Sequence, residues 1–149
     1  MDRRELLTAG ALGLIALHLS PGSALAAEAK KPAAPDPKRA LLDALSRCIQ
    51  AGEVCQAHCV DELAKGNVSM ATCNKRVHEM LAMCRATLSL AALDSTLLPQ
   101  AATVCAAACK ACAEACAEHK AHFSHGMHLA CKDCMESCQA CERACAAVK

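Results

Sequence analysis

Aromatic side chains are almost absent from this sequence, which has no Trp, no Tyr and a single Phe among 149 residues. β-Sheets favour aromatic and β-branched residues, whereas the Ala, Leu, Lys and Glu that dominate here favour helices. The composition therefore predicts an all-α protein. A chain of this length is expected to form one domain, and it is long enough for a four-helix bundle.

An excess of either charge is also missing, since the sequence has 16 basic and 15 acidic residues. Nucleic acids and anionic membrane surfaces attract proteins through clustered positive charge, so neither is an expected partner. No nucleophile, general base or carboxylate pair forms a recognisable catalytic constellation, and we do not expect an enzyme. The sequence therefore indicates a binding or structural protein.

The N-terminus resembles an export signal that ends at Ala26. Arg3 and Arg4 precede an apolar run over residues 9–19, and a small-x-small cleavage site follows at residues 24–26. The run is too short for a permanent membrane helix, so the mature form is not expected in the membrane. Paired arginines are typical of the twin-arginine (Tat) route, although an ordinary secretory signal also fits. Either signal predicts export to the bacterial periplasm.

Residues 27–36 are expected to form a flexible tether, because prolines occur there among Ala and Lys. The folded domain over residues 37–149 then opens with Asp36 as an N-cap and Pro37 at the first helical position. Further caps and breakers divide this domain into four helices. The helices are expected to begin near Pro37, after Ser69, just before Pro99 and at Met127. The first three are expected to end at Gly66, at residues 94–96 and near Phe123.

Cysteine is the residue that this sequence has in excess, with fourteen in all. From Cys105 to Cys116 the successive cysteines are 4, 3 and 4 residues apart, and from Cys131 to Cys145 they are 3, 4, 3 and 4 residues apart. This spacing follows the helical repeat, so it places these thiols on the core-facing stripes of two helices.

The first two helices carry sparser stripes of the same kind. With short connections, the four helices are expected to form an antiparallel up-down-up-down bundle with a cysteine-lined core. The two sparser stripes consist of Leu41, Leu45, Cys48, Gly52, Cys55 and Cys59, and of Cys73, Val77, Met80, Cys84, Thr87 and Ala91. The candidate metal ligands are Cys48, Cys55, Cys59, Cys73, Cys84, Cys105, Cys109, Cys112, Cys116, Cys131, Cys134, Cys138, Cys141 and Cys145.

Disulfides are the usual use of cysteine in exported proteins, and an even number of cysteines allows full pairing. Residues three or four apart on a helix have Cβ atoms about 5 to 6 Å apart, whereas a disulfide needs roughly 3.5 to 4.5 Å. A shared metal ion fits better, because two sulfurs on opposite sides of one ion lie roughly 4.5 Å apart. Disulfides between helices, in a stapled structural protein, stay open as an alternative.

Charge selects among the metals. A core with fourteen thiolates needs cations of closely matching charge. Cu(I) at about one ion per cysteine gives a neutral core, whereas zinc at about one ion per four thiolates leaves two negative charges at each site. Because thiolates also prefer soft Cu(I), we expect a store of multiple Cu(I) ions. A zinc or general heavy-metal (metallothionein-like) module is the alternative, since Cys-x-x-Cys pairs such as Cys109/Cys112 are typical zinc ligands.

A segment rich in histidine and methionine separates the two dense cysteine runs, at the same end of the predicted bundle as Gly66. We expect this end to load copper through imidazole and thioether ligands, with a solvated polar loop as the alternative. Two histidines off the stripes, His58 and His78, are expected at the surface, while Met83 and Met135 pack beside the core. The candidate loading ligands are His119, His122, Met70, His125, Met127 and His128.

Two cysteine motifs and the twin-arginine start resemble one family. Residues 105–116 read Cys-Ala-Ala-Ala-Cys-Lys-Ala-Cys-Ala-Glu-Ala-Cys, and residues 131–145 read Cys-Lys-Asp-Cys-Met-Glu-Ser-Cys-Gln-Ala-Cys-Glu-Arg-Ala-Cys. They are similar to the exported bacterial copper storage proteins, of the cysteine-rich four-helix bundle copper-binding family. The resemblance covers the whole mature region. It implies Cu(I) on core cysteines, loading through one end, a homo-oligomer such as a tetramer, and a copper chaperone or cuproenzyme as client.

Overall fold

The computed structural model describes residues 36–120, 123 and 129–148. Helices make up nearly all of this part, and no strand occurs in it. The predicted all-α fold is therefore confirmed. The elements are α1 (Pro37–Ala64), the short 3-10 helix η1 (Val68–Met70), α2 (Ala71–Ala92), α3 (Leu98–Ala117) and α4 (Leu129–Ala146).

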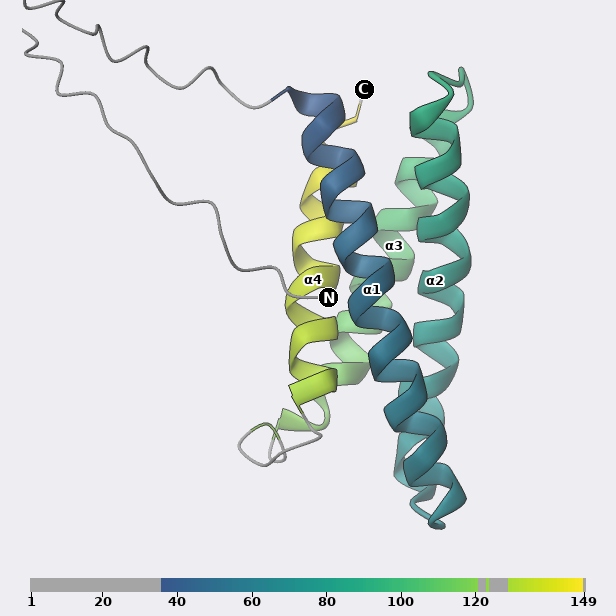
Figure 1. Cartoon of the computed structure of the whole chain (residues 1–149), viewed down its shortest axis with the longest axis vertical. Helices are drawn as coiled ribbons and strands as arrows, with labels where there is room; N and C mark the ends of the chain where they lie inside the picture. Colours follow the sequence, from purple (N-terminus) through teal and green to yellow (C-terminus); the bar gives the residue numbers. More distant parts are fainter. Residues whose placement is uncertain (1–35, 121–122, 124–128, 149) are drawn as a thin grey trace, which may run out of the picture. The chain divides into compact units, whose positions relative to one another are not determined.

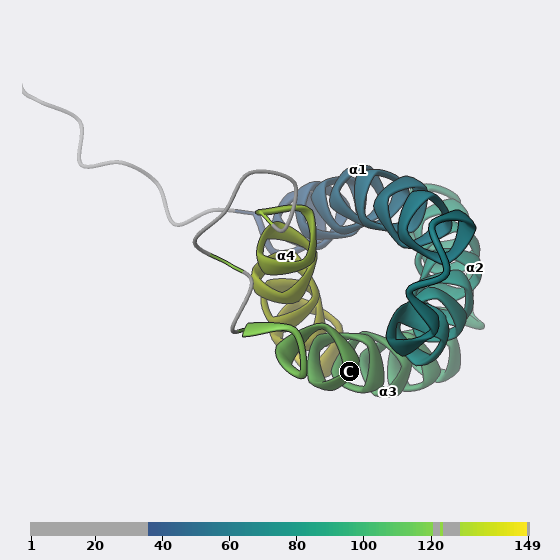
Figure 2. The same ribbon diagram turned by 90° about the horizontal axis from the view of Figure 1, so that it is seen from below.

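The four α-helices form a ring in which each helix packs against two neighbours (Figure 2). α1 packs against α2 and α4, and α3 packs against the same two helices from the opposite side. Consecutive helices run in opposite directions (Figure 1), as short connections require. This is the four-helix bundle that the sequence predicts. Within the described ranges, no helix combines the length and the hydrophobicity needed to cross a membrane.

The two ends of α1 follow the predicted signals. Oδ1 of Asp36 accepts a hydrogen bond from the backbone N–H of Lys38 at 3.1 Å, and Pro37 is the first helical residue. Gly66 has a φ of 87°, which residues with a side chain rarely adopt. The chain therefore leaves the helix just before this glycine.

The start of α2 differs from the prediction, because Ser69 does not cap it. The hydroxyl of Ser69 instead donates a hydrogen bond to Oδ1 of Asn67 at 2.6 Å. Ser69 itself lies within η1, which leads directly into α2. Met70 therefore precedes α2 in place of Ser69, and it makes no capping hydrogen bond with its side chain.

The end of α3 also differs, since the helix stops at Ala117 rather than near Phe123. The backbone N–H of His119 bonds to the carbonyl of Cys116, three residues earlier, at 3.1 Å. Such a tighter turn interrupts the α-helical pattern of bonds between residues four apart. The predicted start of the fourth helix at Met127 lies outside the described residues, and α4 is described from Leu129.

The core of the bundle is built mainly from cysteine. Every residue of the predicted stripes on α1 and α2 is buried, and so is every cysteine of α3 and α4. Met83 and Met135 pack at the edge of this core, as expected. Because Leu41 and Leu45 are among few large aliphatic side chains inside, burial stabilises this bundle less than it would a leucine-rich one.

Candidate metal centre

All fourteen predicted ligands lie in one interior. Each cysteine is at most 2% exposed, and each is a free thiol. The alternating spacing of three and four residues explains this burial, because it keeps every thiol on the inward face of its helix. The thiols come from α1 (Cys48, Cys55, Cys59), α2 (Cys73, Cys84), α3 (Cys105, Cys109, Cys112, Cys116) and α4 (Cys131, Cys134, Cys138, Cys141, Cys145).

Thiols from different helices approach one another closely. At a metal–sulfur distance of about 2.3 Å, the sulfurs around a three-coordinate ion lie about 4.0 Å apart. Several cross-helix pairs are within a few tenths of an ångström of this separation, so small movements would let them share an ion. The Sγ–Sγ distance is 3.6 Å for Cys48 and Cys138, for Cys73 and Cys116, and for Cys84 and Cys105.

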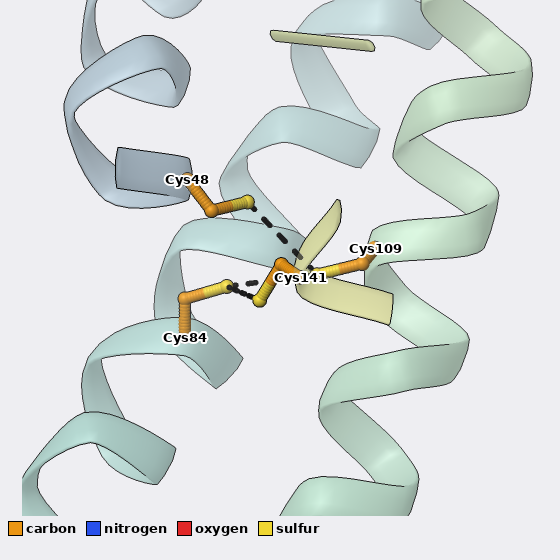
Figure 3. Close-up of side chains that lie close together, drawn as sticks. All are labelled: Cys48, Cys84, Cys109 and Cys141. Carbon is orange, nitrogen blue, oxygen red and sulfur yellow. Dashed lines mark hydrogen bonds between the residues drawn. The ribbon is translucent and has the colours of Figure 1, made fainter. Parts of the chain in front are cut away.

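One cysteine from each helix meets the others around the interior (Figure 3). The Sγ atoms of this central group, Cys48, Cys84, Cys109 and Cys141, all lie within 4.8 Å of one another. The Sγ atom of Cys84 is 3.7 Å from that of Cys109 and 3.9 Å from that of Cys141. A metal ion bound to this group would connect all four helices.

Four further groups of three thiols occur in the described residues, and the groups share members. Cys141 also belongs to the central group, while Cys55 and Cys134 each belong to two of the three-thiol groups. A thiolate that is shared between two sites can bridge two ions. The further groups are Cys105, Cys141 and Cys145; Cys112, Cys134 and Cys138; Cys55, Cys116 and Cys134; and Cys55, Cys59 and Cys73.

Hydrogen bonds between the thiols raise the pKa of some of them and lower the pKa of others. The bonds of Cys84 to Cys105 and Cys109, together with burial, raise the pKa of Cys84 far above its usual range. A hydrogen bond with Cys112 lowers the pKa of Cys134 to about 6, although burial opposes this shift. Thiols with a raised pKa hold their protons at neutral pH and must release them to bind a metal. The thiols with a raised pKa are Cys55, Cys73, Cys84, Cys109, Cys112, Cys138 and Cys145.

Met80 brings a further sulfur atom into this interior, which the spacing of the cysteines does not reveal. Its side chain is fully buried. Its Sδ accepts hydrogen bonds from the thiols of Cys48 at 3.4 Å and of Cys84 at 3.6 Å. The one indication in the sequence is the position of Met80 on the α2 stripe, between two cysteines.

Two of the six predicted loading ligands are described, and both are buried. Met70 ends η1 and is 2% exposed, while His119 follows α3 and is 8% exposed. Nε2 of His119 makes no hydrogen bond to the described residues. Both residues lie at the end of the bundle where α1 ends and α4 begins (Figure 1). The other candidates, His122, His125, Met127 and His128, lie outside the described residues.

The expected surface position of His58 is wrong, because this side chain is only 4% exposed. It lines a cleft between α1 and α4, together with Asp61 of α1 and Asp133 of α4. His58 directly precedes Cys59, so it lies beside the inward stripe of α1. His78 is exposed, as expected.

A comparison with protein families agrees with this geometry. Residues 34–149 match the family model described as copper storage protein. No curated protein matches the sequence. The match includes all four helices and every cysteine, and the buried thiol groups fit the binding of metal ions. The chain therefore belongs to the copper storage protein family.

Proposed function

We propose that this protein stores Cu(I), at about one ion per cysteine, on thiolates inside its four-helix bundle. The observation that carries the proposal is the sharing of thiols between groups by Cys55, Cys134 and Cys141. Bridging thiolates allow more ions to bind than separate sites with four ligands each would allow. The bundle is then a container for many ions rather than a scaffold for one.

The charge of the interior supports a monovalent ion. Fourteen buried thiolates would repel one another and would lack hydration, at a cost of several kcal/mol for each uncompensated ion. One Cu(I) per thiolate removes this net charge. Zinc at about one ion per four thiolates leaves each site with two negative charges.

Zinc is nevertheless a second candidate, because the central group offers four thiols within 4.8 Å of one another. Four thiolates are a common structural zinc site. This alternative predicts tight binding of about three ions per chain, given the number of thiols. It also predicts that a modest excess of Cu(I) does not displace the zinc.

Copper loads, in this proposal, at the end of the bundle that carries Met70 and His119. Both side chains are buried there, and Nε2 of His119 has no hydrogen bond to the described residues. Among the described residues, no cysteine, methionine or histidine lines the pocket at the opposite end, which Leu41, Ala91 and Leu98 line in part. The four candidates outside the described residues, His122, His125, Met127 and His128, would add ligands at the loading end.

The proposed setting is the bacterial periplasm, after export by the twin-arginine route and cleavage behind Ala26. Arg3, Arg4 and the apolar run that follows them support this. The mature protein is proposed to be a homo-oligomer that supplies a copper chaperone or a cuproenzyme. N-terminal sequencing of the secreted protein tests the cleavage, and sedimentation of the purified protein tests the oligomer.

Anaerobic titration of the reduced protein with Cu(I), in competition with a Cu(I) chelator, tests the storage function. The expected result is saturation near one ion per cysteine, with tight retention throughout. Saturation at only about three or four ions per chain would instead match separate four-thiolate sites and would overturn the proposal. Counting of free thiols in denatured protein that was purified without reductant tests the disulfide alternative, which predicts few free thiols.

A further inference from the structure

Met80 is a core residue whose thioether sulfur contacts two of the thiols. Its Sδ is 3.4 Å from Sγ of Cys48 on α1 and 3.6 Å from Sγ of Cys84 on its own helix. The two thiols belong to the central group, in which all sulfurs lie within 4.8 Å of one another. Three soft sulfur atoms from two helices therefore surround one point.

The size of this triangle suits a metal ion. Sides of 3.4 Å, 3.6 Å and at most 4.8 Å place a point equidistant from the three sulfurs at no more than about 2.4 Å from each. The usual metal–sulfur distance is about 2.3 Å. An ion can thus bind Cys48, Cys84 and Met80 together with almost no movement of the side chains.

The neighbouring helix leaves room for this methionine. Gly52 lies on the buried stripe of α1, and a Cβ atom at this position would lie 2.6 Å from Cε of Met80. A glycine inside a helix costs about 0.5 to 1 kcal/mol relative to alanine. This unfavourable residue occurs where a larger one would push the Met80 side chain away from the two thiols.

From these contacts we infer that Met80 is a thioether ligand for Cu(I), completing a three-coordinate site with the thiolates of Cys48 and Cys84. This inference rests on the proposed storage of Cu(I). Cys48 and Cys84 bind as thiolates, each with one negative charge, whereas the thioether has no proton to lose and stays neutral. The site therefore carries one negative charge less than a site of three thiolates, and Cys109 and Cys141 are left to bind neighbouring ions.

The thioether also distinguishes between metals. Methionine sulfur is a soft ligand that suits Cu(I), whereas structural zinc sites use thiolate, imidazole and carboxylate ligands. A site that includes Met80 thus favours copper, although the four thiols of the central group, two of which contact Met80, could accept zinc.

X-ray absorption at the selenium edge tests the inference directly in selenomethionine-labelled protein loaded with Cu(I). Met80→Leu is the test variant, and Met83→Leu is the matched control on the same helix, where the side chain packs only at the edge of the core. Both are volume-conserving changes, for which a stability cost under about 1.5 kcal/mol is expected. The selenium–copper contact is expected in the wild type and in Met83→Leu, and it should decrease in Met80→Leu.

A parallel competition titration measures what the ligand contributes. Met80→Leu should lose Cu(I) to a chelator at least several-fold more readily than Met83→Leu, for about one ion per chain, while the other ions are retained. If neither the selenium–copper contact nor the retention differs between the two variants, Met80 is a packing residue and the inference is overturned, while the storage function stands. If the wild type fails to take up multiple Cu(I) ions, both proposals fail together.

Discussion

Gly52 on α1 and Met80 on α2 fit together as a pair, because the methyl group of Met80 fills the space that a side chain at position 52 would need. This contact directs the methionine sulfur toward Cys48 and Cys84, whose thiols both bond to it. The pair connects the packing of two helices with the ligands of the central group.

Gly52→Ala is expected to weaken Cu(I) retention several-fold. The new Cβ atom would lie 2.6 Å from Cε of Met80 and 2.8 Å from Cδ2 of Leu81, so the methionine must move. Alanine also favours the helix by about 1 kcal/mol, which offsets part of the strain and keeps the bundle folded. Competition with a Cu(I) chelator measures the retention.

The control for Gly52→Ala is the same substitution in a Met80→Leu background. If Gly52 affects copper retention through the sulfur of Met80, Gly52→Ala should cause little further loss of retention once Met80 has been replaced by leucine. An equal additional loss in both backgrounds would show that position 52 acts through the backbone or through Leu81 instead.

Cys84→Ser is expected to remove more than one Cu(I) ion per chain. The thiol of Cys84 lies within 3.9 Å of those of Cys105, Cys109 and Cys141, so its thiolate can bridge several ions. Cys145→Ser is the matched control, because its thiol bonds to two other thiols, those of Cys105 and Cys141. Copper per chain, measured after anaerobic loading and gel filtration, should fall by about one ion in this control. Equal losses in the two variants would contradict the bridging arrangement.

Copper retention is expected to weaken as the pH falls, because protons compete with Cu(I) for the thiolates. The raised pKa of Cys84 and of Cys109 means that these groups are protonated in the metal-free protein at neutral pH. Each proton displaced by copper makes the logarithm of the affinity rise by about one per pH unit. Cys134, with a pKa of about 6, contributes to this slope only below that pH.

Two measurements check the pH dependence. Chelator competition between about pH 8 and pH 5 gives the slope, and loading in a weakly buffered solution with a pH indicator counts the protons released. An affinity that does not change with pH, after correction for the chelator, would mean that protonated thiols are not the ligands.

His119→Asn is expected to slow the loading of Cu(I) several-fold while leaving the final number of bound ions unchanged. The imidazole is buried, with Nε2 lacking a hydrogen bond to the described residues, and it lies at the proposed loading end. His78→Asn is the control, since His78 is exposed on α2 and interacts with Gln56. Stopped-flow mixing with a Cu(I) complex measures the rate. Similar rates in the two variants would remove His119 from the loading path.

Helical periodicity was sufficient to predict most of the fold. Residues that follow one another in steps of three and four lie on one face of a helix, whichever helix packs against that face. The inward position of Cys105 or Cys138 could therefore be predicted from spacing alone. The limits of α1 were predictable for a similar reason, because Asp36, Pro37 and Gly66 act through local backbone geometry. Ser69 was predicted wrongly because it lies within η1, so Met70 rather than Ser69 precedes α2.

The sequence by itself determined that the fourteen thiols face one interior, because burial on a helix depends on spacing along that helix. Only the tertiary structure decided which thiols meet, since Cys48 and Cys138 are 90 residues apart and their contact depends on the axial register of α1 and α4. The same packing buried His58 in the cleft between α1 and α4 and placed Met80 beside Gly52 and the two thiols. Contacts between helices arise from side chains that fill each other's gaps, and no periodicity within one helix contains that information.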